Sequence, residues 1–78
     1  MHDATLSFEY DTADRARLVE RSVGQEVGEI AGDRTEATVS REDRTVAVRV
    51  TAADLVALRA GLNTWASLVS VAERIAAG

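Results

Sequence analysis

The sequence predicts an α+β domain in which two helices cover a three-stranded antiparallel sheet, in the order strand, helix, strand, strand, helix. Three segments alternate apolar and polar residues with a period of two, which is typical of half-buried strands. Two other segments place their apolar residues at helical intervals, and the second of them is long. With 78 residues, the chain is expected to form one domain over residues 1–78.

The first strand is predicted from Ala4 to Tyr10, where apolar residues alternate with Thr, Ser and Glu. A helix should follow and reach about Val23, because Asp11 or Thr12 can cap its first turn. The second and third strands are predicted over residues 35–40 and 45–50. They are joined by a short hairpin through residues 42–44.

The last element is predicted to be a helix of roughly 25 residues, or about 37 Å at 1.5 Å per residue. Thr51-Ala52-Ala53-Asp54 resembles a capping box, with Asp in place of the preferred Glu or Gln. No helix breaker except Gly61 follows before Gly78. This helix should therefore begin at Thr51 and is long for so small a domain.

The apolar residues of this helix cover an arc of about 200°, twice what a single sheet face can bury. One half of the arc should lie on the sheet: Leu55, Leu58, Leu62, Trp65, Val69, Ala72 and Ala76. The other half, together with Leu18 of the first helix, predicts a surface that docks a partner helix. It comprises Ala57, Ala60, Gly61, Thr64, Leu68, Val71 and Ile75. The alternative is that the first helix covers this half by itself.

The composition excludes several classes of protein. No Cys is present, so a disulfide framework and a Cys-based zinc site are ruled out. There is no uninterrupted apolar run of about 18 residues and no signal peptide at the N-terminus, so we expect a cytoplasmic protein without a membrane segment. The formal net charge of −4 argues against a dedicated nucleic-acid binder. The absence of Lys beside this acidity also suggests adaptation to a cytoplasm rich in salt.

No set of residues predicts catalysis, a metal site or a cofactor. His2 is the only histidine, and the acidic residues fall mainly in caps and turns. The basic cluster of Arg15, Arg17 and Arg21 could contact RNA, or it could form ion pairs with Asp14 and Glu20 on a solvated helix. Arg59 and Asn63 lie one helical turn apart. They could bond the sheet edge or each other, or they could contact a partner.

The stretch from Ala53 to Trp65, A-D-L-V-A-L-R-A-G-L-N-T-W, resembles the motif A-D-L-x-A-L-R-A-x-L-N-S-[YW] of a known family. This family is the small Pcc-type subunit of the KEOPS (EKC) complex. The segments from Ser22 to Glu26 and from Gly32 to Thr35 resemble the same family, although Gln25 replaces its Pro and Gly61 replaces a larger helix former. The matching helix positions are Asp54, Leu58, Arg59, Leu62, Asn63 and Trp65.

The resemblance implies a non-catalytic subunit of a complex that makes N6-threonylcarbamoyladenosine in tRNA. It implies that the chain docks the synthase subunit of KEOPS through its helices and pairs with a copy of itself or with a Pcc-type paralogue. Binding of tRNA would then be indirect, through the complex. Two other functions remain open: a small RNA-binding module related to KH domains, and an α+β dimer that senses a small ligand.

Overall fold

The three alternating segments form one antiparallel sheet. Its strands are β1 (His2–Glu9), β2 (Thr35–Glu42) and β3 (Thr45–Ala52), and each has eight residues. Their order in the sheet is β1-β3-β2, so the last strand in the sequence is the central one. Strand β3 is paired with both of the other strands, which explains why its inward-facing residues are the most deeply buried in the sheet.

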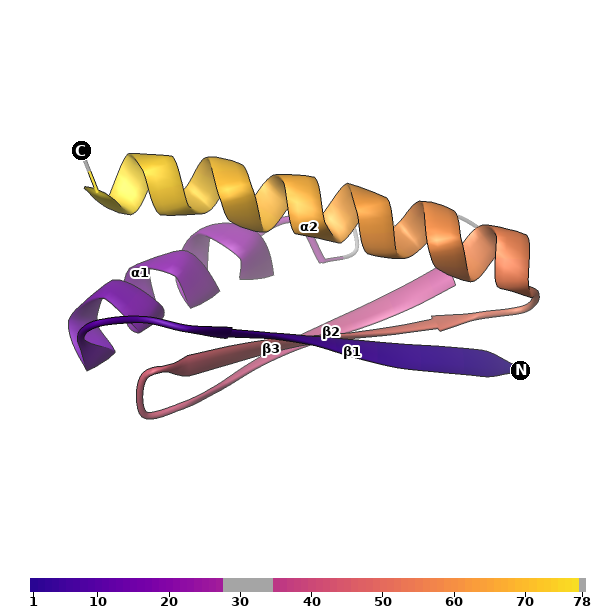
Figure 1. Cartoon of the computed structure of the whole chain (residues 1–78), viewed down its shortest axis with the longest axis horizontal. Helices are drawn as coiled ribbons and strands as arrows, with labels where there is room; N and C mark the ends of the chain where they lie inside the picture. Colours follow the sequence, from indigo (N-terminus) through magenta and orange to yellow (C-terminus); the bar gives the residue numbers. More distant parts are fainter. Residues whose placement is uncertain (28–34, 78) are drawn as a thin grey trace.

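The computed structural model describes residues 1–27 and 35–77. The helices are α1 (Ala13–Gly24) and α2 (Leu55–Ala77), and both lie on the same face of the sheet (Figure 1). These elements confirm the predicted fold class and element order. The part of the family resemblance that rests on residues 32–34 lies outside the described residues.

The register of the sheet separates an inner face from an open face. Val48 lies between Leu6 and Val39, and these side chains point toward the helices. The next row places Arg49 beside Thr5 and Thr38 on the other face, since successive side chains of a strand alternate. The open face consequently carries Thr and Ser side chains and the guanidinium of Arg49 along its middle, and the carboxylates of Asp3, Glu9, Glu36 and Glu42 nearer the strand ends.

The core is formed mainly of valine and alanine. Trp65 is its one buried aromatic side chain among the described residues, and no polar or charged residue among them is buried. The core residues come from α1, β3 and α2: Ala16, Val19, Val23, Val46, Val48, Val50, Ala52, Ala57, Leu58, Trp65, Val69 and Ala72. Small side chains let both helices approach the sheet closely.

Helix α2 begins later than the sequence predicts. Thr51 lies in β3, paired with Asp3 and Glu36, so it cannot cap the helix. Asp54 does so instead: its Oδ1 accepts a hydrogen bond of 2.8 Å from the backbone N–H of Ala57. The predicted capping box is therefore wrong at its first position. The strand continues two residues further because β3 is hydrogen-bonded on both sides.

The buried stripe of α2 is rotated about the helix axis from its predicted position. Leu55 was assigned to the sheet but is 64% exposed. Ala57 was assigned to the docking surface but is buried. Gly61 also faces inward, because a Cβ atom on it would lie 3.0 Å from Cγ1 of Val50. The physical reason is that β2 and α1 pack against the side of α2 that the sequence predicts to be free for a partner helix.

Candidate protein-docking surface

The two helices expose several large apolar side chains. Leu18 on α1 is 50% exposed, and Val71 and Ile75 on α2 are 44% and 69% exposed. Helix α1 lies beneath the C-terminal half of α2 (Figure 1), and it has 12 residues against 23 in α2. Because the shorter helix cannot flank the whole of the longer one, part of the predicted apolar surface stays uncovered.

A groove follows the line where α1 ends beside α2. It has a volume of about 210 Å³. We name it the helix groove; it is lined by Ser22, Val23, Gln25, Glu26, Leu68, Val71, Ala72 and Ile75. Its position results from the end of α1 near Gly24, where the N–H of Gln25 bonds the carbonyl of Arg21. The groove is thus apolar on its α2 side and polar on its α1 side.

The predicted docking residues divide into three groups. Leu68, Val71 and Ile75 line the helix groove. Ala60 and Thr64 are exposed on α2, and the hydroxyl of Thr64 bonds the carbonyl of Ala60 at 3.0 Å. Ala57 and Gly61 belong to the interior, as described above. The exposed large apolar side chains of α2 therefore lie toward both ends of the helix: Leu55 and Val56, 64% and 76% exposed, at its start, and Val71 and Ile75 toward its C-terminal end.

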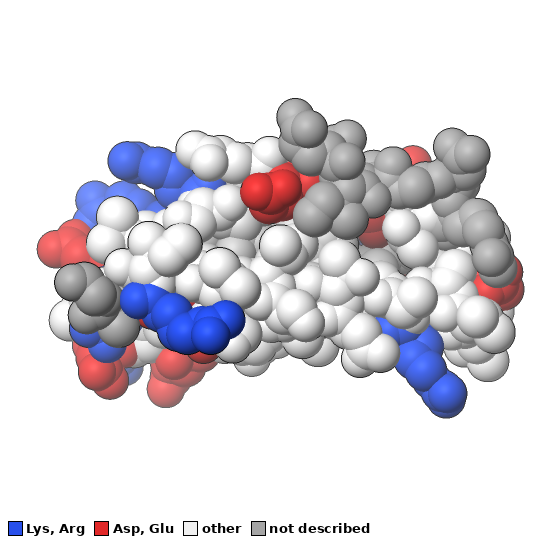
Figure 2. All heavy atoms as spheres, turned by 90° about the horizontal axis from the view of Figure 1, so that it is seen from above, with Lys and Arg blue, Asp and Glu red and all other residues white. Residues whose placement is uncertain are grey.

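Leu18 does not line the helix groove. It lies in a separate hollow of about 300 Å³ on α1, lined by Asp14, Arg17, Leu18 and Arg21. Figure 2 shows the face that carries α2. Uncharged atoms run along its middle, and the charged side chains in view lie mainly toward its ends and margins.

The arginines of α1 are largely engaged in local ion pairs. Arg15 pairs with Asp11 at 3.6 Å, and Arg17 pairs with Asp14. Glu20, which the sequence offers as a partner for this cluster, instead pairs with Arg41 of β2 at 3.2 Å. Within residues 1–27 and 35–77, Arg21 has no ion pair. The structure therefore shows part of the predicted ion pairing and does not test contact with RNA.

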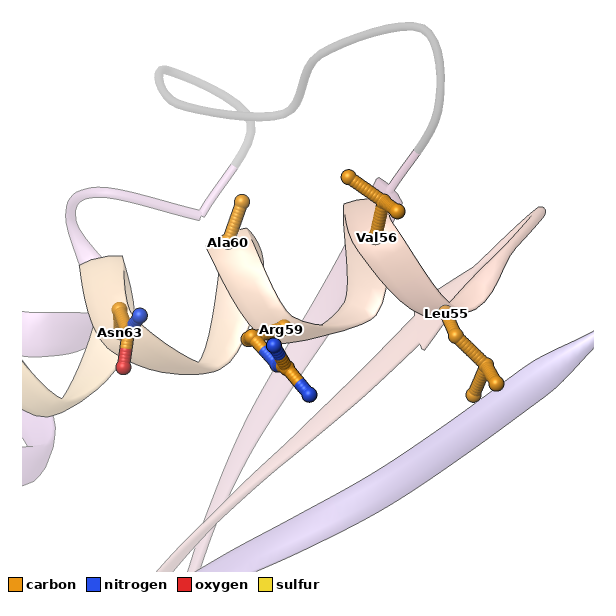
Figure 3. Close-up of a pocket in the computed structure, with 5 residues that line it drawn as sticks. All are labelled: Leu55, Val56, Arg59, Ala60 and Asn63. Atoms are coloured by element: carbon orange, nitrogen blue, oxygen red, sulfur yellow. The ribbon is translucent and has the colours of Figure 1, made fainter.

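A second hollow, of about 370 Å³, lies at the start of α2. All of its lining residues come from this helix: Leu55, Val56, Arg59, Ala60 and Asn63. Figure 3 shows that Val56 and Ala60 point to one side of the helix and Leu55 and Arg59 to the other. Side chains that diverge in this way do not converge on a small ligand, which normally sits among a few convergent polar groups.

The helix positions that match the family motif differ in where they lie. Asp54 caps α2, while Leu58 and Trp65 are core residues and Leu62 is half-buried against the core. Arg59 and Asn63 are exposed and, in the part of the chain that the structure describes, bond neither each other nor the sheet edge. No three His, Cys, Asp or Glu side chains among the described residues are placed to hold a metal ion.

A contact that the sequence did not predict joins the end of β1 to α2. The hydroxyl of Tyr10 donates a hydrogen bond of 2.8 Å to Oε2 of Glu73. Burial, followed by the hydrogen bond and the negative charge of Glu73, raises the pKa of Tyr10 above its ordinary value. The sequence signal was weak, since Tyr10 ends the alternating strand and Glu73 falls on the polar strip of the helix.

The segment Leu55–Ala76 is long and apolar enough to cross a membrane by length and composition, with a mean hydropathy of 1.3. The sequence-based expectation of no membrane segment considered only uninterrupted apolar runs, and it stays a prediction. The test alone is weak, because a helix of a folded core passes it too. In the structure α2 packs along α1 and the sheet (Figure 1).

The fold and the surface together define a small α+β domain, in which one helical layer covers a sheet and presents apolar side chains outward. A protein-family model described as "Transcription factor Pcc1" matches residues 3–77, so the chain belongs to the Pcc1 family. This confirms the resemblance to the Pcc-type subunit that the sequence showed.

Solved structures share the fold. A chain of the structure described as "Crystal structure of binary complex Gon7-Pcc1" is similar with a TM-score of 0.83 and 16% sequence identity. The likeness covers 95% of this chain and 90% of that one. At this identity the likeness establishes the fold alone. A search of curated proteins gives no match.

Proposed function

We propose that the chain is a non-catalytic subunit of a KEOPS complex and supports N6-threonylcarbamoyladenosine modification of tRNA by docking the synthase subunit. The observation that carries this proposal is the exposure of Val71 and Ile75 beside the helix groove in a chain of the Pcc1 family. Burial of such side chains contributes about 1.5–3 kcal/mol each when it is complete. A helix of the synthase lying in the groove would supply that burial.

The open face of the sheet is the second surface that the proposal uses. Its central row places Arg49 between Thr5 and Thr38. Arg49 Nη2 bonds Asp3 Oδ2 at 2.9 Å, so both charges lie on the face where a second chain could pair with them. We propose pairing here with a second copy or a paralogue. The structurally similar chain comes from a structure described as a binary complex of Gon7 and Pcc1, which supports a protein as a partner.

The docking test compares substitutions of exposed apolar residues on α2. Val71→Asp and Ile75→Asp should each lower retention of the co-expressed synthase at least tenfold, because a carboxylate would be buried without a partner. Leu55→Asp is the matched control: Leu55 is 64% exposed and points away from Val56 and Ala60 (Figure 3). Circular dichroism checks that each variant is folded.

Equal retention of the synthase by all three variants would place docking elsewhere. Leu68→Asp should also abolish binding, but Leu68 packs against the core, so its effect combines docking with folding. Affinity of the isolated chain for tRNA that falls steeply with salt would favour the RNA-binding alternative. A small ligand that raises the melting temperature would favour the sensing alternative.

A further inference from the structure

One side-chain hydrogen bond joins α2 to the sheet. Among residues 1–27 and 35–77, a single side-chain hydrogen bond connects α2 to a distant part of the chain. It runs from Tyr10, directly after β1, to Glu73, 63 positions later in the sequence. Tyr10 is itself fixed, because its backbone N–H donates to the carbonyl of Arg44 at 2.9 Å and extends the pairing of β1 with β3. The hydroxyl is thus held at the end of the sheet.

Glu73 lies in the same turns of α2 as the exposed residues of the helix groove. At 100° per residue, Val71 and Ile75 each lie about 200° from Glu73, on the opposite side of the helix. The inward contacts of these turns come from Ala72 and Ala76, whose side chains are small. Few apolar contacts therefore hold this end of α2, and helix ends with few contacts open most readily.

The bond is of a strong kind. Its acceptor is a carboxylate, and hydrogen bonds to an ionised acceptor are roughly twice as strong as neutral ones. At neutral pH the Tyr10 hydroxyl is protonated and can donate, as for any tyrosine with a pKa near or above about 10. Burial, followed by Glu73, raises the pKa of Tyr10 further.

We propose that the Tyr10–Glu73 hydrogen bond positions the C-terminal turns of α2 for docking, by holding the side of the helix that faces away from Val71 and Ile75. This inference rests on the proposed function, since it names what orders the docking surface. Tyr10 and Glu73 are positioning residues and do not themselves contact the partner. Without the bond, the turns from Ala72 onward open more often and the helix groove loses its α2 wall.

The test uses the full chain and removes one hydroxyl at a time. Tyr10→Phe keeps the ring and loses the bond to Glu73. Thr12→Val is the control, since it removes a hydroxyl that caps the distant start of α1 by accepting from the N–H of Arg15 at 3.1 Å. Backbone hydrogen exchange should become about tenfold faster in residues 72–77 for Tyr10→Phe, and should stay unchanged there for Thr12→Val.

Affinity for the co-expressed synthase is the second measurement. Tyr10→Phe should weaken it about tenfold at a temperature where the chain is fully folded, whereas Thr12→Val should leave it as in the native chain. Glu73→Gln should fall between native and Tyr10→Phe in both measurements, because the amide oxygen still accepts a hydrogen bond without the charge. If the bond only stabilised the fold, a control variant of equal stability would lose as much affinity for the synthase as Tyr10→Phe does.

Two results would overturn the proposal. Unchanged exchange in residues 72–77 would show that the bond does not hold this end of α2. Faster exchange with unchanged synthase affinity would show that the order of these turns is irrelevant to docking, while the proposed function would stand. If even the native chain retains no synthase, the proposed function fails and docking through this surface fails with it.

Discussion

Gly61 of α2 lies directly above Val50 of β3, at a distance where a Cβ atom on Gly61 would be 3.0 Å from Val50 Cγ1. Val50 is fully buried, and as a β-branched residue it has little rotamer freedom with which to yield. Thr35 Cγ2 would lie 3.5 Å from the same Cβ. Glycine at this position lets the helix cross the sheet closely.

Gly61→Val should therefore lower the free energy of unfolding by about 1–3 kcal/mol through overpacking. Ala60→Val, one residue earlier and exposed, is the control and should cost only about 0.5 kcal/mol of helix propensity. Urea unfolding followed by circular dichroism measures both. If the two variants unfold at the same midpoint, Gly61 is not needed for the close approach.

Asp54→Ala should lower the free energy of unfolding by about 1 kcal/mol, because the N–H of Ala57 would lose its acceptor. Thr51→Val should change it by less than about 0.5 kcal/mol, since valine suits the central strand in which Thr51 is paired. Thermal unfolding distinguishes the two. A larger loss for Thr51→Val would restore Thr51 as the capping residue.

Asp43 has a positive φ of 56° in the turn between β2 and β3. Asp43→Val should destabilise the chain by about 1–2 kcal/mol, because a β-branched side chain disfavours this conformation. Asp43→Gly should be neutral or stabilising, since glycine adopts it freely. Chemical unfolding of both variants checks this, and equal effects would argue against backbone strain at the turn.

Tyr10 should ionise at a pH above the ordinary tyrosine pKa of about 10, since its pKa in the folded chain is raised. Well below pH 10 the hydroxyl is protonated in both the folded and the unfolded chain, so the raised pKa does not make the free energy of unfolding depend on pH there. Above it the unfolded chain loses the proton first, and stability falls as pH rises. Tyr10 is the chain's single tyrosine, so ultraviolet absorbance reports it alone. An ordinary midpoint would contradict the structure.

The sequence sufficed for the strands and helices because each has a clear period. Alternation over eight-residue strands leaves little choice of register, since a shift by one residue would move Val46, Val48 and Val50 to the open face. The family motif of α2 likewise gave the correct family. Strand register and family membership depend on the spacing of nearby residues, which can be seen in a single sequence.

The orientation of α2 could not be predicted in the same way. Its apolar arc is so wide that several rotations bury similar residues, and the choice depends on where β2 and α1 pack. Ala57 and Gly61 therefore turned inward and Leu55 outward. The helix groove needs the end of α1 beside α2, and the bond between Tyr10 and Glu73 needs the end of β1 there. Both are tertiary relationships that no local pattern contains.

The central place of β3 determines when this chain can fold during synthesis. Neither β1 nor β2 has a hydrogen-bonding neighbour in the sheet until β3 is made. The backbone bond from Tyr10 to Arg44, just before β3, likewise joins segments that are far apart in the sequence. The first 52 of the 78 residues must therefore have left the ribosome before the pairing of the strands can be complete.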